Sequence, residues 1–524
     1  MIARGRHARV AVLALAAVGA VPSFAGCYYR PALFADHEII DAVEDDRPIP
    51  LPSVRTFDER EQVSDIYLRR PLFDFVHPVD FPTGGDVNAM DEVAASTWYE
   101  PTATAKWGAL VAQAAPPTPP LVAIDEDPAT DEEALVVRDA RGLRYELIAD
   151  PAGRPGLRTG ADVVAGHLLR GLGLHAPMSW IVTVAPSALV APAERTIERV
   201  RAWSQGKAVL ANGGRRVSAT LWPMGIDVGV CNDFNTRSDD PNDKIDHHDR
   251  RTLRAMKVFG AWLGWSGFGV RNTRDVYVGV PGEGHLVHTF VGLSRALGTM
   301  DLLDRPTRDE RGGGVFFNLV TLGLSPAKTT PARRSPFPSL GYLPTTLAAA
   351  AYDVSPPYSP FVRFTPPDEY WAAKRLLDTG YESLVAAVAA ARLPDDASHR
   401  LSETLLSRRH VLVAHGMSVV SPLDPAATSG RSVWLRDRAI AAGLIGPNDT
   451  RYEIAFLDND GRARAPSVRL DATGPLTAVA IPPELSGLVV LHVWVIRDGA
   501  AAPRPCDVHV IAKDATTRVI GVRH

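Results

Sequence analysis

Hydrophobic and polar residues alternate along several short stretches of the chain, and this period of two predicts β-strands. The runs 134–138 and 143–148 lie on either side of the Gly-containing stretch 139–142, a pattern typical of a β-hairpin. Another strand is expected over 180–184, and a second hairpin is expected within 276–291.

Apolar residues with helical spacing follow the first hairpin. Thr159 has Asp162 three residues after it, which is the spacing of a capping box, and Gly171 is a stop signal. The apolar positions between them are Ala161, Val164, Ala165, Leu168 and Leu169. We therefore expect a helix over 159–171 that opens at Thr159.

Two longer helical regions and a final β-rich region complete the pattern. Helical spacing covers 249–264, and it returns over 369–415 with breaks at Gly380 and Pro394. The C-terminal part alternates again, as in 488–496, which predicts a small β module. The fold class expected from these patterns is α+β.

The N-terminus has the features of an export signal. Three arginines precede the apolar run 10–21, which is too short to span a membrane comfortably. The small residues before Cys27 resemble the lipobox of bacterial lipoproteins, with Phe24 where that pattern usually has leucine. This resemblance implies that residues 1–26 are removed and that Cys27 carries the lipid. The alternative is an ordinary secretory signal followed by a cysteine by chance.

Composition and charge narrow the class of protein. Hydrophobic residues make up 46% of the 524 positions, charged residues 22%, and the net charge is -4. These values exclude a mainly disordered, collagen-like or coiled-coil chain, and they lack the basic bias typical of nucleic-acid binding. Three cysteines are too few for a disulfide scaffold. We expect Cys231 and Cys506 to be buried free thiols, with a disulfide between them as the alternative.

The same patterns suggest where the domains begin and end. We expect a signal peptide over 1–26, then an extended N-terminal segment and Pro-rich linker over 27–119. A body of mixed helices and strands covers 120–420, and a β-rich module covers 421–524.

Several stretches of the body resemble a family of uncharacterised bacterial envelope lipoproteins whose folds are similar to those of protein and lipid kinases. The stretches that carry the resemblance are 91–99, 150–151, 159–164, 239–251, 258–263 and 369–374. The resemblance implies a kinase-like body, with β-hairpins plus helices followed by a helical C-lobe.

The resemblance also indicates which residues would carry phosphoryl transfer. In the family, the phosphate-binding lysine lies two residues before the Asp150-Pro151 pair, and this chain has Ile148 there. Asp162 occupies the position of the acid that pairs with that lysine. Because its partner position is apolar, we interpret Asp162 as the capping-box residue.

The loop positions of the family are also altered. The catalytic loop aligns on 264–272, where Gly267 replaces the aspartate and Gly269 the basic residue, and only Asn272 is retained. Gly292 replaces the metal-binding aspartate. Phosphoryl transfer depends on neutralising charge in the transition state, so these losses predict a catalytically degenerate, pseudokinase-like domain. We interpret Asn272 as a residue that structures its loop.

Two polar clusters suggest other chemistry. Asp246, His247, His248 and Asp249 have residue types that fit zinc. Adjacent residues on a helix point in different directions, so we favour a capped helix start and predict no metal. The other cluster is an acidic stretch, expected to be a solvated turn, made of Asp233, Asp239, Asp240 and Asp243. Arg271 and Arg274 are expected to be exposed.

The function expected from these observations is that of a membrane-tethered envelope lipoprotein that binds or scaffolds an envelope protein partner. We expect no cofactor, and a bound nucleotide would not support catalysis. The location implied by the lipid anchor is the outer membrane, facing the periplasm or the surface. One alternative is an active phosphotransferase that uses displaced carboxylates, such as Asp150 or Asp275. The other is an envelope protein that binds a small ligand or polymer.

Overall fold

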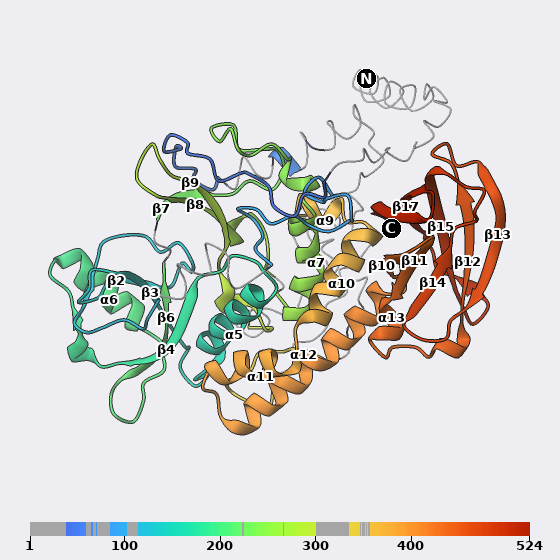
Figure 1. The fold of residues 1–524 in the computed structure, drawn as a ribbon. Helices are drawn as coiled ribbons and strands as arrows, with labels where there is room; N and C mark the ends of the chain where they lie inside the picture. The colour runs from blue at the N-terminus through green and yellow to red at the C-terminus, as the bar shows by residue number, and fades with distance from the viewer. Residues whose placement is uncertain are drawn as a thin grey trace, which may run out of the picture.

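The computed structural model has a mixed α+β fold made of a sheet, a helical middle and a β-rich end (Figure 1). It describes residues 38–58, 64–66, 70, 84–101, 114–222, 225–265, 267–299, 335–345, 347, 352, 354 and 357–524. The predicted signal peptide and Cys27 therefore lie outside the described residues. Within the described part, no helix combines the length and apolar character needed to cross a bilayer.

The first sheet has six strands in the order β4-β6-β3-β2-β1-β5. The strands are β1 (Leu121–Ala123), β2 (Leu135–Arg138), β3 (Arg144–Ala149), β4 (Met178–Val184), β5 (Leu189–Val190) and β6 (Arg215–Leu221). All neighbours are antiparallel except β1 and β5. The predicted hairpin is confirmed as β2 and β3, whose turn contains Gly142 with a φ of 81°.

Two helices pack against this sheet. Helix α5 (Leu157–Gly171) joins the sheet to the main hydrophobic core, to which its apolar residues belong. Helix α6 (Glu194–Ser204) packs against the sheet through Trp203, whose Nε1 donates to the Leu147 carbonyl over 2.9 Å. The 3₁₀ turn η2 (Pro186–Ala188) precedes α6.

Helices make up the middle of the molecule. They are α7 (Arg251–Leu263), α9 (Ser359–Val362), α10 (Pro366–Asp378), α11 (Tyr381–Ala390) and α12 (Asp395–Gly416). The predicted breaks are confirmed, because Gly380 precedes α11 and Pro394 precedes α12. A three-stranded sheet lies beside α7: β7 (Ile226–Val230), β8 (Thr273–Val278) and β9 (His285–Phe290). Three 3₁₀ turns adjoin these elements: η3 (His247–Asp249), η4 (Val270–Asn272) and η5 (Leu293–Arg295).

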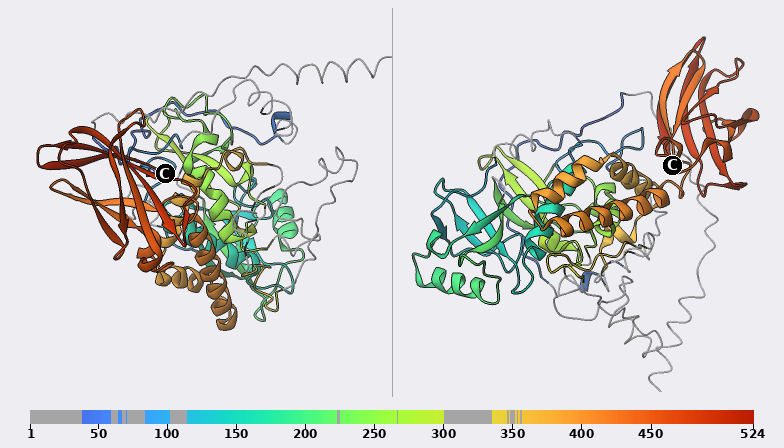
Figure 2. Two further views of the ribbon diagram at one scale, coloured as in Figure 1. Left: turned by 90° about the vertical axis from the view of Figure 1, so that its right-hand side faces the viewer. Right: turned by 90° about the horizontal axis from the view of Figure 1, so that it is seen from below.

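The C-terminal part forms two antiparallel sheets around their own core (Figure 2). The smaller sheet has β10 (Leu423–Ser429), β11 (Ser432–Asp437) and β14 (Leu476–Ala480). The larger has β12 (Thr450–Leu457), β13 (Ala463–Asp471), β15 (Gly487–Arg497), β16 (Ala500–Ala501), β17 (Cys506–Lys513) and β18 (Thr516–Arg523). Helix α13 (Arg438–Ala441) and turn η8 (Pro447–Asp449) connect them. Ion pairs join this part to α10 and the N-terminal segment, including Lys374 with Asp424 at 3.3 Å and His524 with Asp91 at 2.8 Å.

One predicted helix start and one predicted turn are wrong. Helix α5 begins at Leu157, and Asp162 lies inside it, buried, where it cannot act in a capping box. In the predicted solvated turn, Asp233, Asp240 and Asp243 are all buried. Asp233 pairs with the distant Arg70 at 2.6 Å, and Asp243 pairs with Arg250 at 2.7 Å, so these carboxylates are buried together with a cation. Cys231 and Cys506 are buried free thiols, as expected.

Candidate functional site

The junction of β3 and α5 is organised by Asp150. Its carboxylate accepts hydrogen bonds from the backbone N–H groups of Gly156, Arg158 and Thr159, at 2.7, 2.9 and 3.0 Å. N–H groups in the first turn of a helix have no partner within the helix, so a buried carboxylate at this place stabilises that turn. Asp150 is therefore fully engaged in holding α5. Ile148 is buried in β3, where it pairs in register with Ser218.

Asp162 lies on the face of α5 turned toward β4 and β6. Thr220 Oγ1 donates to its carboxylate over 2.9 Å, and the Thr220 hydroxyl also lies 3.0 Å from that of Ser179. Burial raises the pKa of Asp162 to about 6, although hydrogen bonds from Ser179 and Thr220 oppose this shift. Asp162 is thus bound by hydroxyl groups where a kinase would have the charge of a lysine.

Asn272 joins the two loops in which the family has catalytic acids. Its Oδ1 accepts from the Gly269 N–H over 2.9 Å, and its Nδ2 donates to the Val291 carbonyl over 3.1 Å. Gly292 follows directly, with a φ of 78°. A Cβ at Gly292 would lie 2.4 Å from Asn272 Nδ2, so an aspartate there would be strained by the positive φ and would displace the Asn272 side chain. Gly267, by contrast, faces open space.

A segment between β1 and β2 reaches across to these loops, and we call residues 124–134 the acidic loop. Asp131 at its centre is buried and pairs with Arg158 of α5 at 2.5 Å. It also accepts a hydrogen bond from the Ser294 hydroxyl in η5. Burial alone would raise the pKa of Asp131, but the charge of Arg158 and these hydrogen bonds hold it below its usual value.

Further contacts hold the C-terminal end of the acidic loop. Glu132 pairs with Arg271 of η4 at 2.6 Å. Glu133 pairs with Arg158 at 2.6 Å and with Lys207 at 2.5 Å. The carboxylates of the loop thus engage cations from α5, from the segment after α6 and from η4.

The base of the acidic loop is fixed by Glu146 of β3. Its buried carboxylate accepts from the backbone N–H groups of Ala129 and Thr130, at 2.7 and 2.8 Å. Glu146 also pairs with Arg144 at 2.9 Å. The acidic loop is therefore a packed part of the fold.

The acidic loop is not among the features predicted from the sequence. The signal was present, because six acids stand between two predicted strands at 125–133. Arg271 is exposed, as expected, with a side chain that is 45% accessible, and it pairs with Glu132. The expectation for Arg274 needs correction, because its side chain is only 22% exposed. Arg274 is likewise engaged, with Asp227 at 2.5 Å.

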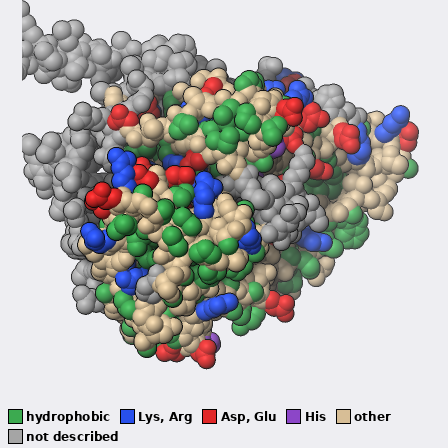
Figure 3. Space-filling view, turned by 90° about the vertical axis from the view of Figure 1, so that its left-hand side faces the viewer, with side chains coloured by type: hydrophobic (Ala, Val, Ile, Leu, Met, Phe, Trp, Pro, Cys, Tyr) green, Lys and Arg blue, Asp and Glu red, His purple; other side chains and the backbone are tan. Residues whose placement is uncertain are grey.

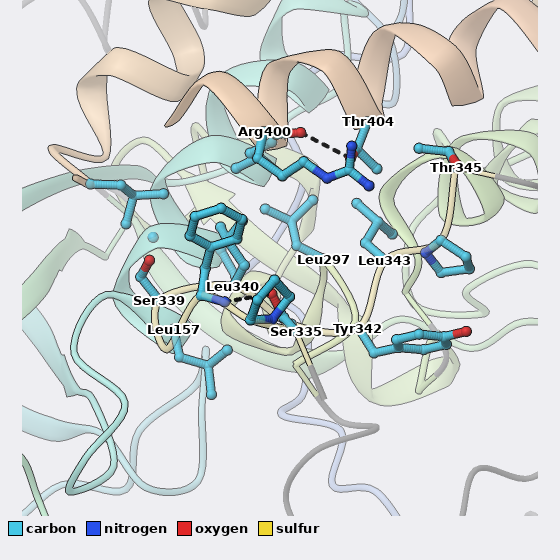
Figure 4. A pocket seen from close by; sticks show the side chains of 18 residues that line it. Leu157, Leu297, Ser335, Ser339, Leu340, Tyr342, Leu343, Thr345, Arg400 and Thr404 are labelled. Carbon is cyan, nitrogen blue, oxygen red and sulfur yellow. Dashed lines mark hydrogen bonds between the residues drawn. The ribbon is translucent and has the colours of Figure 1, made fainter. Parts of the chain in front are cut away.

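A separate cavity of about 440 Å³ opens beside the start of α5 (Figure 4). Leu157 and Leu297 line it on one side, and Arg400 and Thr404 of α12 on the other. Apolar side chains supply much of the lining, and Arg400 adds one charge. Gly160 and Ala161 also line it, but none of the positions that the resemblance aligns with phosphate-binding or catalytic residues does.

On the surface beyond the sheet, acidic and basic side chains stand next to one another (Figure 3). Asp125 pairs there with Arg199 at 2.7 Å, and Asp127 pairs with the same arginine at 3.0 Å. This mixed surface lacks the single sign of charge that attracts a polyanion.

Comparisons with known proteins give little further information. No family model matches the chain, and no curated protein matches it. A solved structure that was found similar is the crystal structure of a Helicobacter pylori proinflammatory kinase, CtkA. The two chains share 12% identity with a TM-score of 0.31, over 55% of this chain and 95% of that chain. The class defined by the fold is thus a mixed α+β protein with a β-rich C-terminal part.

Proposed function

We propose that the chain is a membrane-tethered envelope lipoprotein whose kinase-like body is catalytically degenerate and serves to bind or scaffold an envelope protein. The order of hairpin, helix and strand, followed by a second hairpin and a helical region, supports the kinase-like body. The observation that carries the proposal is the acidic loop, because its carboxylates hold the cations that would otherwise face a phosphate group.

The physical argument concerns charge. A nucleoside triphosphate is strongly anionic, and its transfer chemistry requires cations and metal-binding carboxylates around the phosphates. Here Arg158 and Arg271 are paired with the acidic loop, and Asn272 is bonded to backbone groups. A phosphate group would have to displace carboxylates from these cations. Its binding would therefore exchange existing ion pairs for new ones without adding any.

The alternative phosphotransferase with displaced carboxylates finds no support in the two named acids. Asp150 accepts three backbone hydrogen bonds at the start of α5. Asp275 is buried and pairs with Arg237 at 2.7 Å and with His288 at 2.8 Å. Both carboxylates would have to leave these partners before they could bind magnesium.

Calorimetric titration of the purified full chain with ATP, with and without magnesium, tests the degenerate body. We expect no heat of binding at millimolar nucleotide. Magnesium-dependent binding would contradict the proposal. The matched variant Glu132→Gln/Glu133→Gln removes two half-exposed charges of the acidic loop. A gain of ATP binding in this variant would show that the acidic loop prevents ATP binding in the wild type.

The membrane tether has a test of its own. In a bacterial host, the wild-type chain should incorporate a labelled fatty acid and sediment with membranes. The Cys27→Ser variant should lose the label and leave the membrane fraction. Retention of the label in this variant would overturn the anchor and leave the ordinary secretory signal.

A further inference from the structure

Three side chains converge at the turn that leads into α7. Asp246 immediately precedes the 3₁₀ turn η3, which ends at Asp249, and the Asp249 N–H donates to the Asp246 carbonyl over 2.8 Å. His248 Nε2 lies 3.9 Å from Asp246 Oδ2 and 3.7 Å from Asp249 Oδ2. The three ligand atoms all lie within 4.8 Å of one another. The α-helical directions assumed from the sequence do not apply to this turn.

The imidazole of His248 is oriented so that one nitrogen is left available. Its Nδ1 lies 2.9 Å from the Phe234 carbonyl, which can only accept, so Nδ1 carries the proton. The distances from Nε2 to both carboxylates are too long for hydrogen bonds. The lone pair of Nε2 faces the two carboxylates, and a cation bound between the three groups would stabilise this arrangement.

A second set of contacts holds the three groups in place. Arg254 and Arg363 both donate to Oδ1 of Asp249, at 2.6 and 3.1 Å, and this leaves Oδ2 directed toward His248. The ring of Phe234 stacks on that of His248 at 4.5 Å. Metal-binding histidines and carboxylates are usually oriented by outer partners of this kind.

We propose that Asp246, His248 and Asp249 form a zinc-binding site. Imidazole nitrogen with carboxylate oxygen suits a divalent transition metal better than calcium or magnesium. Zinc ligands at about 2.0–2.2 Å stand about 3.3–3.5 Å apart in tetrahedral geometry, so a small rotation of Asp246 closes the site. The side chain of Asp246 is 46% exposed, which leaves a path for the ion and a position for water.

A second group of side chains has residue types that suit a metal ion, but its polar groups already bind one another. Cys231, Asp275 and His288 also lie within 4.8 Å of one another and are all buried. Asp275, however, is bound by both His288 and Arg237. These groups satisfy one another, whereas Nε2 of His248 has no hydrogen-bond partner among the described residues.

Zinc titration of the metal-stripped full chain against a chromophoric chelator tests the proposal. We expect one zinc ion per chain, and at least about tenfold weaker binding in Asp246→Asn. Asp246 is half-exposed, so this variant should fold normally. The matched control is Asp449→Asn, an exposed aspartate at the end of the 3₁₀ turn η8, which should bind zinc like the wild type. Absence of binding in the wild type, or equal binding in Asp246→Asn, would overturn the site.

Discussion

The acidic loop and the turn before α7 both bring carboxylates next to basic side chains. They differ in whether these polar groups find partners within the chain. In the acidic loop, Asp131 and Glu133 are paired with Arg158 at 2.5 and 2.6 Å. At the turn, Nε2 of His248 stands 3.7 and 3.9 Å from two carboxylates, one of which is half-exposed.

This difference distinguishes side chains that stabilise the fold from side chains that can bind a ligand. A buried charge whose partners all come from the chain itself holds the fold together and offers nothing to a ligand. A fixed lone pair with open access offers a ligand position that the chain does not fill. Residue types alone do not distinguish the two regions, because both contain acids beside basic residues.

The largest expected effect comes from breaking the acidic loop. Arg158→Met leaves Asp131 buried without its cation and should lower the free energy of unfolding by about 3–5 kcal/mol, measured by urea denaturation. Arg138→Met, which removes a surface pair with Glu126 at 3.5 Å, should cost less than about 1 kcal/mol. Equal costs for both variants would show that the loop is not held as described.

The next effect concerns the pH dependence of stability. The pKa of Asp162 is raised to about 6, so the folded chain binds more protons than the unfolded chain between about pH 4 and 6. Wild-type stability from this group therefore falls as pH rises through that window. The Asp162→Asn variant has no titrating carboxyl group at this position, so it does not show this fall in stability.

The change in stability caused by Asp162→Asn should therefore depend on pH. Relative to the wild type, the variant should gain about 2 kcal/mol between pH 4 and pH 7.5, by denaturation at both values. Asp449→Asn serves as the exposed control with no such gain. A difference that is independent of pH would show that Asp162 is not buried among hydroxyl groups alone.

A smaller effect tests the contact between Asn272 and Gly292. Gly292→Ala combines a positive φ with a Cβ 2.4 Å from Asn272 Nδ2, so it should cost about 1–2 kcal/mol of unfolding free energy. Gly269→Ala is the control, since its backbone is extended and its Cβ would face open space. Thermal unfolding should separate the two variants, and similar midpoints would argue against this packing.

The smallest effect is expected at the turn in the absence of metal. Asp246→Asn removes a half-exposed charge and should change the free energy of unfolding by no more than about 0.5 kcal/mol. With saturating zinc the wild type should become more stable and the variant should not, because only the wild type binds the ion tightly. A large loss without metal would mean that Asp246 has a structural role.

The sequence predicted the elements that local signals control. The β2–β3 hairpin follows from its Gly-containing turn, and the breaks before α11 and α12 follow from Gly380 and Pro394. The start of α5 was missed because its cap, Asp150, lies six residues before the first capped N–H. Nothing in the local pattern links a carboxylate at the end of a strand to the helix that follows.

The candidate sites depend on contacts that the sequence does not encode locally. Asp233 is buried because Arg70, far away along the chain, reaches it, and Asp131 because of Arg158. The convergence at η3 could not be predicted from the sequence, because it depends on Asp246 standing just before the turn with an extended ψ of 131° and on Phe234 orienting His248. The residue types therefore identified candidate site residues, while the geometry showed which of these residues already have partners within the chain.

Amide hydrogen exchange across the acidic loop tests the central claim most directly. The N–H groups of Ala129 and Thr130 donate to Glu146, so peptides covering 124–134 should exchange slowly. We predict that millimolar magnesium-ATP leaves this exchange, and that of 264–272, unchanged. Fast exchange of the loop, or new protection of 264–272 with nucleotide, would contradict an acidic loop whose carboxylates already hold the nearby cations.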